Sequence, residues 1–281
     1  MSVWHTSRFV IDLSRPQVMG IVNVTPDSFS DGGSHEGVSA AMAHAEQLLR
    51  DGADILDIGG ESTRPGSPAV PLDEELRRVL PVVHEAVRLN VPISIDTYKP
   101  AVMQAVLDAG ADIINDIWAL RQPGAQQVVA QHAQCGVCLM HMHADPQTMH
   151  QAHMPDADVV GQVLQFLQQH TQALQTLGVQ SNRIVWDAGT GFGKSVAHNF
   201  LLLQQQQQLA VAGYPLLAGW SRKGSLGKVT GREVTERMPA SIAAALLSVE
   251  HGAAIVRVHD VRETVDALAV LRAMQQPPAN L

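Results

Sequence analysis

The feature that most constrains the fold of this chain is a regular alternation between short β-branched apolar runs and longer amphipathic stretches. The runs with the length and composition of strands are Val18–Val24, Ile55–Gly59, Pro92–Thr97, Ile113–Ile117, Val137–Met142, Ile184–Asp187, Pro215–Ser221 and Ile255–Asp260. The stretches with helical periodicity are Val38–Arg50, Asp73–Leu89, Pro100–Ala109, Ala125–Ala133, Val159–Leu177, Phe200–Val211, Pro239–His251 and Arg262–Met274. Strict alternation of eight strands with eight helices predicts a closed parallel (β/α)8 TIM barrel, in the α/β class.

The length of the chain agrees with one barrel. It has 281 residues, and a (β/α)8 barrel typically takes ~250. A doubly wound open sheet is the alternative, but it usually has fewer strands or irregular additions. No linker or change of composition divides the sequence, so we expect a single domain over residues 1–281. Residues 1–17 form a short N-terminal extension, in which Phe9–Leu13 is expected to be a short strand covering the lower end of the barrel.

Charge and composition exclude several classes of partner. The formal net charge is −8, from 19 Lys and Arg against 27 Asp and Glu. Nucleic acids and anionic membranes favour a basic surface, so neither is expected as the main partner. The apolar runs are too short to span a bilayer, and the N-terminus has no apolar signal core. With two Cys and no export signal, the sequence predicts a cytoplasmic protein without disulfides.

Polar side chains stand at the end of every predicted strand. In a (β/α)8 barrel, these ends and the loops after them carry the active site. The residues concerned are Asn23, Glu61, Ser62, Thr63, Arg64, Asp96, Asn115, Asp116, His141, Asp187, Ser221, Arg222, Lys223, Arg257 and His259. One such residue could be a helix N-cap, and Arg257 and His259 could form a structural pair with Asp260. Repetition around the whole rim favours an active site.

The residue types indicate two kinds of ligand. Acceptor and amide groups suit a flat heterocycle rich in N–H donors, and they are supplied by Asp96, Asn115 and Asp187. Cations suit a phosphorylated substrate, and they are supplied by Arg64, Lys223, Arg257 and His259. The segment Ser221–Gly224 also leads toward a helix, whose N–H groups favour an anion. Two long loops, Thr25–Gly37 and Glu61–Leu72, have the length of lids or substrate clamps.

Several segments resemble the signature motifs of the bacterial dihydropteroate synthases, in the order in which the family has them. The two long and specific ones are Asn23-Val24-Thr25-Pro26-Asp27-Ser28-Phe29-Ser30-Asp31-Gly32-Gly33 and Gly59-Gly60-Glu61-Ser62-Thr63-Arg64-Pro65-Gly66. The shorter ones are Ser94-Ile95-Asp96-Thr97, Ile114-Asn115-Asp116, Leu139-Met140-His141-Met142, Ser221-Arg222-Lys223 and Arg257-Val258-His259-Asp260. Together they cover nearly the whole chain.

The resemblance implies a homodimeric barrel that uses Mg²⁺ and is a target of sulfonamides. It would condense 6-hydroxymethyl-7,8-dihydropterin diphosphate with 4-aminobenzoate and release diphosphate. The resemblance assigns the pterin to Asp96, Asn115, Met140, Asp187, Phe192, Lys223 and Arg257. It assigns the diphosphate to Asn23, Thr63, Arg64, Arg257 and His259, with Asn23 also binding the metal. It assigns 4-aminobenzoate to Phe29, Thr63, Pro65, Ser221, Arg222 and Lys223, and the chemistry of the reaction to Asp96, Lys223, Arg257 and His259.

Two departures from the family pattern affect this assignment. After the sixth predicted strand the family commonly has Asp-Pro-Gly-Phe-Gly-Phe-Gly-Lys, whereas this chain has Asp187-Ala188-Gly189-Thr190-Gly191-Phe192-Gly193-Lys194. Gly224 stands where the family usually has a Ser whose hydroxyl helps to hold the 4-aminobenzoate carboxylate. We therefore expect weaker 4-aminobenzoate and sulfonamide binding than in relatives with that Ser.

Other functions are possible from the sequence. The segment Ala188–Ser195 fits a relaxed phosphate-binding loop of a nucleotide hydrolase, although the family's own glycine loop accounts for it.

Zinc binding by Cys135, Cys138, His141 and His143 is not expected, because an extended strand separates Cys135 from His141 by roughly 20 Å. A methyltetrahydrofolate-dependent corrinoid methyltransferase has a similar barrel but no diphosphate to bind. A non-catalytic pterin-binding paralogue is the remaining alternative.

Overall fold

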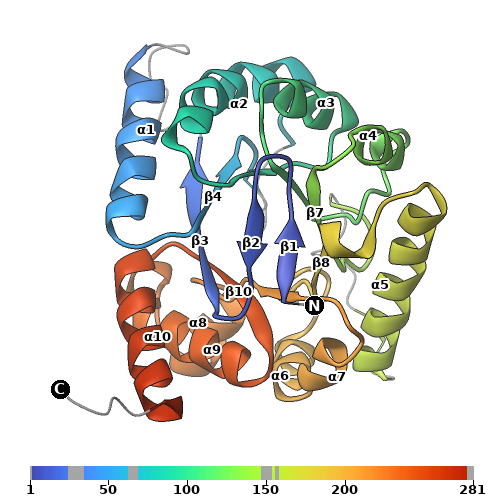
Figure 1. Ribbon diagram of the computed structural model, residues 1–281. Coiled ribbons are helices and arrows are strands. Elements are labelled where there is room, and N and C mark those ends of the chain that lie inside the picture. The colour runs from blue at the N-terminus through green and yellow to red at the C-terminus, as the bar shows by residue number, and fades with distance from the viewer. Residues whose placement is uncertain (1, 25–34, 63–68, 147–153, 156–157, 277–281) are drawn as a thin grey trace.

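Eight parallel strands close into a barrel in the computed structural model, which describes residues 2–24, 35–62, 69–146, 154–155 and 158–276 (Figure 1). The strands are β3 (Gln17–Asn23), β4 (Ile55–Gly59), β5 (Ile93–Asp96), β6 (Ile113–Asp116), β7 (Gly136–Met140), β8 (Ile184–Asp187), β9 (Leu216–Ala218) and β10 (Ala253–Val258). Each strand pairs with the next, and β10 closes the barrel by pairing with β3. The (β/α)8 barrel predicted from the alternation is confirmed.

Helices surround the barrel on its outside (Figure 1). They are α1 (His35–Arg50), α2 (Leu72–Ala86), α3 (Pro100–Asp108), α4 (Ala125–Gln131), α5 (Val159–Thr176), α6 (Val196–Gln204), α7 (Gln207–Ala210), α8 (Gly224–Thr230), α9 (Met238–Glu250) and α10 (Val261–Gln275), with short 3₁₀ turns η2 (Val87–Leu89), η3 (Ser181–Arg183) and η4 (Val234–Glu236). The main apolar core lies between these helices and the outer face of the strands.

Two helical segments differ from the sequence prediction. The stretch Phe200–Val211 is divided between α6 and α7. This stretch contains the glutamine run Gln204–Gln208, in which Gln206 is buried and donates to the backbone oxygens of Ser248 and His251. The seven-residue helix α8 is the helix expected after Ser221–Gly224, but its bounds were not predicted, because its glycines and β-branched residues have low helix propensity.

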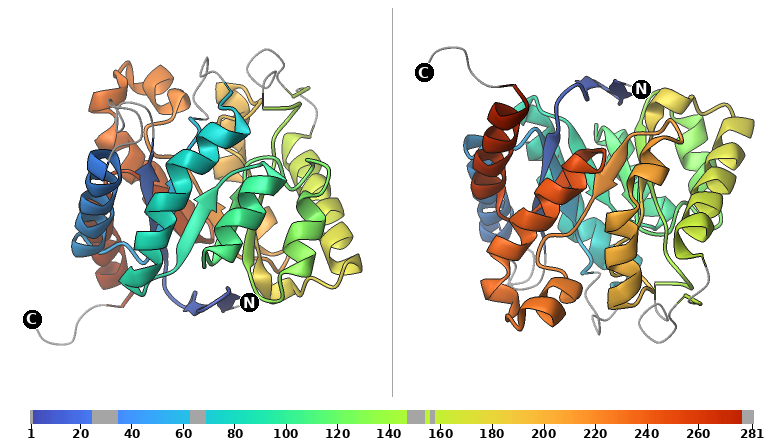
Figure 2. Two further views of the ribbon diagram at one scale, coloured as in Figure 1. Left: turned by 90° about the horizontal axis from the view of Figure 1, so that it is seen from above. Right: turned by 90° about the horizontal axis from the view of Figure 1, so that it is seen from below.

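An N-terminal hairpin covers the end of the barrel at which the strands begin (Figures 1 and 2). It consists of β1 (Val3–His5) and β2 (Val10–Asp12), which pair antiparallel. Trp4 is fully buried in one cluster with Met19, Ile55 and Ile255 from the lower barrel, and its Nε1 donates to the Arg183 backbone oxygen at 2.9 Å. The expected segment Phe9–Leu13 is therefore a strand with its own partner.

Side-chain alternation along the strands divides the barrel interior into layers. Successive side chains of a strand point to opposite faces, so Met19, Ile55, Ile113, Cys138, Val185 and Ile255 fill the lower layer. Two residues further along the same strands come Asp57, Asn115, Met140, Asp187 and Arg257. The lower barrel is thus an apolar plug, and the polar chemistry begins directly above it.

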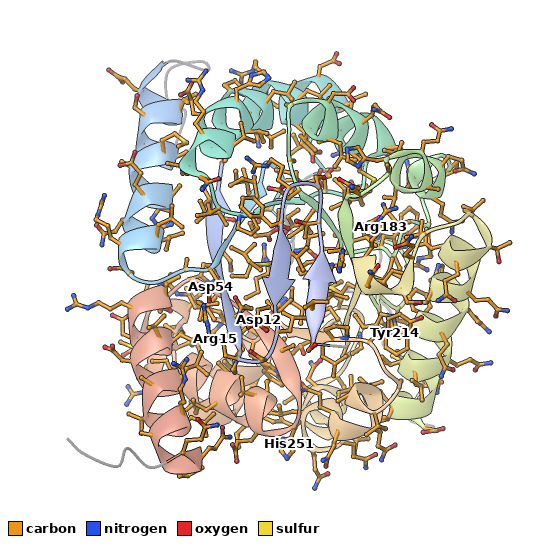
Figure 3. The ribbon with its side chains drawn as sticks, viewed as in Figure 1. Asp12, Arg15, Asp54, Arg183, Tyr214 and His251 are labelled. Atoms are coloured by element: carbon orange, nitrogen blue, oxygen red, sulfur yellow. The ribbon has the colours of Figure 1, made fainter. Side chains whose placement is uncertain are left out.

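The hairpin end of the barrel is held by surface polar contacts (Figure 3). Arg15 pairs with Asp54 at 2.5 Å, and Asp54 also accepts the Val18 backbone N–H at 2.9 Å.

Among the described helices, none combines the length with the apolar character that a membrane span needs.

Candidate active site

The strand ends opposite the hairpin surround a cavity of about 740 Å³. Its lining includes Asn23 from β3, Asp96 from β5, Arg257 from β10 and His259 just beyond β10. The segment after β9 adds Ser221, Arg222 and Lys223, and the segment after β8 adds Phe192. Residues from five strands or their following loops, far apart in the sequence, therefore face one space. Such convergence follows from parallel strands whose C-terminal ends share one rim.

Arg257 is held by two carboxylates at the floor of this cavity. Its Nε donates to Asp57 Oδ2 at 2.6 Å, and its Nη2 donates to Asp96 Oδ2 at 2.8 Å. Asn115 Nδ2 also donates to Asp57 Oδ2, at 3.1 Å. Asp57 therefore fixes the positions of both Arg257 and Asn115. This residue was not among the candidates that the sequence suggested.

One oxygen at the floor has no protein partner among the described residues. Asp57 is fully buried, and its Oδ1 accepts no hydrogen bond there. A buried acceptor without a partner is costly. The floor of the cavity is therefore kept polar at a cost in stability, which is typical of functional sites.

Burial shifts the protonation of the ionisable groups around the cavity. It raises the pKa of Asp96, against the lowering effect of Arg257. It also raises the pKa of Asp187, whose Oδ1 accepts the Gly189 backbone N–H at 2.7 Å. Burial lowers the pKa of Lys223 to about 8, and the Asp187 carboxylate partly opposes this shift. The pKa values of Asp96, Asp187 and Lys223 are thus shifted toward the physiological pH range, as in many active sites.

A buried apolar cluster, here called the apolar wall, lies beside these polar groups, and its Phe192 lines the cavity. Met140 and Phe192 are buried in one cluster with Ile117 and Met142. The Lys223 Nζ lies over the Phe192 ring, 4.1 Å from its centroid, in cation–π geometry. The wall and the polar groups together suit a planar ring with polar edges.

Ser221 connects the last two strands at the rim. Its Oγ accepts the His259 backbone N–H at 3.1 Å and lies 2.9 Å from His259 Nδ1. Arg222 pairs with Asp260 at 2.6 Å. Asp260 therefore pairs with Arg222, and Arg257 pairs with Asp57 and Asp96 instead.

Four of the sequence candidates lie outside the described residues: Phe29, Thr63, Arg64 and Pro65. The described residues just before the last three are anchored by neighbouring elements. Glu61 accepts from Lys99 Nζ and from the Tyr98 hydroxyl, the latter at 3.1 Å. Lys99 also pairs with the buried Glu75 of α2. The sequence candidates did not include Lys99 or Glu75, because no local signal links positions that meet only through the fold.

Gly224 lies at the start of α8 and lines the outer part of the cavity. A Cβ placed on it would meet no atom within 4 Å. The site therefore has open space where the family usually has the Ser hydroxyl.

Comparison with known proteins agrees with this geometry. The model of the family described as pterin binding enzyme matches residues 19–259. The chain belongs to the dihydropteroate synthase family of pterin-binding enzymes. A dihydropteroate synthase of Neisseria meningitidis serogroup B is 49% identical over 278 residues, which cover 97% of each chain.

Solved structures of the family are similar over the whole fold. A Burkholderia cenocepacia dihydropteroate synthase complexed with 7,8-dihydropteroate is 51% identical, with a TM-score of 0.90, and covers 98% of this chain and 96% of its own. A Xanthomonas albilineans dihydropteroate synthase with 4-aminobenzoic acid is 52% identical, with a TM-score of 0.89 and 96% of both chains covered.

Proposed function

We propose that this chain catalyses the condensation of 6-hydroxymethyl-7,8-dihydropterin diphosphate with 4-aminobenzoate, giving 7,8-dihydropteroate and diphosphate. The observation that carries the proposal is the buried Asp57–Arg257–Asp96 network at the floor of a cavity that Lys223 and Phe192 also line. Family membership over nearly the whole chain supports the same reaction.

The pterin ring would lie between the apolar wall and the polar floor. Its N–H and amino donors match the carboxylates of Asp96 and Asp187, and the Asn115 amide can both donate and accept. Lys223 would donate to an acceptor on the ring. The stem of Arg257 would cover one face, opposite the Met140 and Phe192 side.

The diphosphate would lie at the outer end of the pterin, near Arg257 and His259. Ser221 Oγ already accepts a backbone N–H, so its own proton is available to His259 Nδ1. His259 held in this way would present its Nε2 edge to the leaving group. Thr63 and Arg64 would add further contacts, by resemblance to the family.

The donor chemistry around Asn23 fits a Mg²⁺ ion carried by the substrate. Among the described residues, no group of three or more His, Cys, Asp or Glu side chains could hold a metal. Mg²⁺ commonly keeps several waters and binds through one or two protein oxygens plus substrate phosphates. Asn23 ends β3 and lines the cavity, so its amide oxygen would be the protein ligand. When bound, the ion would stabilise the charge of the departing diphosphate.

The reaction needs no protein nucleophile. The C–O bond between the pterin methylene and the diphosphate breaks, and the electron-rich dihydropterin carries the positive charge that is left. Asp96 would stabilise this charge. The uncharged 4-aminobenzoate amine then forms the C–N bond and loses a proton. Phe29, Thr63, Pro65 and the segment Ser221, Arg222 and Lys223 would orient the aminobenzoate.

The assembly and cellular place of the enzyme follow the family expectation. We propose a homodimer in the cytoplasm. Both cysteines are buried and free, which is compatible with a reducing compartment. Size-exclusion chromatography with light scattering tests the oligomeric state.

A direct assay for diphosphate release tests the proposed reaction. Release should require the pterin diphosphate, 4-aminobenzoate and Mg²⁺ together. A corrinoid methyltransferase would release no diphosphate, and a non-catalytic paralogue would bind the pterin without turnover. Either outcome would exclude the synthase.

A further inference from the structure

The glycine-rich segment after β8 has a lysine whose role the proposed function does not explain. Lys194 closes the pattern that resembles a phosphate-binding loop, in which a lysine would face an anion. Here Lys194 is 4% exposed. Its ammonium is turned inward, where it donates hydrogen bonds to three neutral carbonyl oxygens.

These carbonyls belong to two different segments at the rim. Lys194 Nζ donates to the Gly189 oxygen at 2.8 Å, to the Phe192 oxygen at 3.1 Å and to the His141 oxygen at 3.2 Å. Gly189 and Phe192 belong to the loop between β8 and α6, residues 188–195, whereas His141 follows β7. One ammonium group therefore closes the loop on itself and fastens it to the neighbouring strand end.

The loop is packed closely on that strand end, and the Lys194 contacts add to this packing. Gly189 has φ +68°, and a Cβ on it would lie 1.8 Å from the His141 oxygen. Gly193 has φ +66°, and a Cβ on it would lie 2.7 Å from the His143 Cβ. Left-handed φ and close approach both require glycine here. Glycine also makes the loop flexible in itself, so an additional tie is needed to hold one conformation.

The fastened loop carries the groups assigned to the pterin. Phe192 packs against Met140 and Met142 and faces Lys223 Nζ. Asp187 lies directly before the loop and accepts the Gly189 N–H. A shift of the loop would move Phe192 and release this contact of Asp187, whereas Ser221 and Gly224 lie on the separate segment after β9.

We propose that Lys194 is a positioning residue for pterin binding, which fixes the β8–α6 loop against the end of β7 and so holds Phe192 and Asp187 in their binding positions. The inference rests on the proposed function, because it concerns the same site. A lysine is rarely buried to this degree without a carboxylate partner. Burial lowers its pKa to about 7, so the group is kept in place although its charge is disfavoured.

The chain contains a matched control at the opposite end of the barrel. Arg183 is also buried, and it donates to the backbone oxygens of Cys135 at 2.8 Å, Val129 at 2.9 Å and Ala133 at 3.3 Å. It lies on the hairpin side of the molecule (Figure 3). Arg183 and Lys194 thus have the same type of bonding, a buried cation on three carbonyls, but only Lys194 borders the cavity.

Lys194→Met and Arg183→Met test the inference. We measure kcat, both substrate KM values and the melting temperature of each variant beside the wild type. Both variants should melt at lower temperature. Lys194→Met should raise the pterin diphosphate KM by roughly 10-fold or more, since small displacements of binding groups have large effects. The 4-aminobenzoate KM of this variant should stay within about 2-fold of wild type, and Arg183→Met should leave both KM values unchanged.

Two results would overturn the inference: a wild-type pterin KM in Lys194→Met, or an equal rise of the pterin KM in Arg183→Met. If either methionine variant does not fold, the pair Lys194→Arg and Arg183→Lys replaces it, and the pterin KM should rise only in Lys194→Arg. If the proposed function itself is wrong, the wild type releases no diphosphate. In that case, the variants are compared by their dissociation constants for 7,8-dihydropteroate, measured by titration, in place of the KM values. If only the inference about Lys194 is wrong, the wild type is active and the variants give one of the two results above.

Discussion

Asp57 shows how much of this site depends on a single buried carboxylate. It holds Arg257 and Asn115 together, and its second oxygen has no partner among the described residues. We expect Asp57→Asn to lower kcat/KM for the pterin diphosphate by roughly 10- to 100-fold, because Arg257 loses a charged anchor. Steady-state kinetics measures this. Asp54→Asn is the control, because Asp54 forms an exposed pair with Arg15, and it should leave the kinetics unchanged. Equal kinetics of the two variants would contradict the role of Asp57.

The protonation of Lys223 gives a second test at the residue scale. Its pKa is lowered to about 8 by burial, with Asp187 and Asp96 opposing and Arg257 reinforcing the shift. A lysine that donates to the pterin loses its positive charge on deprotonation, which weakens this hydrogen bond. We therefore expect kcat/KM for the pterin diphosphate to fall as the pH rises through about 8. Lys223→Arg keeps its charge at high pH, so its remaining activity should persist there. An alkaline fall at the same pH in both proteins would assign it to another group.

Gly224 gives a third test, directed at the other substrate. Open space surrounds this position, so a serine hydroxyl can be added without a clash. We expect Gly224→Ser to lower the 4-aminobenzoate KM and the inhibition constant of a sulfonamide by roughly 3- to 10-fold, the effect of one added hydrogen bond. The pterin diphosphate KM serves as the internal control. An unchanged or higher 4-aminobenzoate KM would show that the carboxylate does not lie near α8.

At the scale of elements, the sequence predicted the barrel because each βα unit carries its own signal. Apolar β-branched runs mark the strands, and the barrel rule then brings Asp96, Asn115, Asp187, Lys223 and Arg257 to one rim. A helix was expected after Ser221–Gly224, but the bounds of α8 were not predicted, because its composition opposes a helix outside its tertiary context. The sequence also missed Asp57, since this residue reads as part of an ordinary buried strand. Its partner is 200 residues away in the sequence, and no local pattern reports such a pair.

The N-terminal hairpin gives a prediction at this scale. Trp4 closes the lower barrel without touching the cavity. We expect Trp4→Ala to reduce the free energy of unfolding by about 3–5 kcal/mol, through the loss of apolar burial and the cavity left behind. Urea denaturation measures this change. Both substrate KM values should remain unchanged at temperatures where the variant is folded. A change in either KM would mean that the hairpin and the rim are coupled through the barrel.

At the scale of the whole molecule, an acidic chain must bind an anionic substrate. The net charge of −8 repels a diphosphate at long range, so the few cations have to act locally. Arg257 and Lys223 lie in the cavity together, but Arg257 is already paired with Asp57 and Asp96. Much of its charge is therefore neutralised before the substrate arrives. Arg257 itself therefore offers the leaving diphosphate little free charge, which is a physical reason to expect a metal ion in the reaction.

The last prediction follows from this pairing of Arg257 with two carboxylates. Removal of divalent ions with EDTA should lower the rate of diphosphate release by roughly 100-fold or more, because a metal supplies several kcal/mol of charge stabilisation to a departing phosphate. Re-added Mg²⁺ should restore the rate. Binding of 7,8-dihydropteroate, which has no diphosphate, should be the same with and without EDTA. Asn23→Ala should raise the Mg²⁺ concentration needed for half-maximal rate. Full turnover in EDTA would mean that Arg257 and His259 stabilise the leaving group by themselves, in spite of the carboxylates beside them.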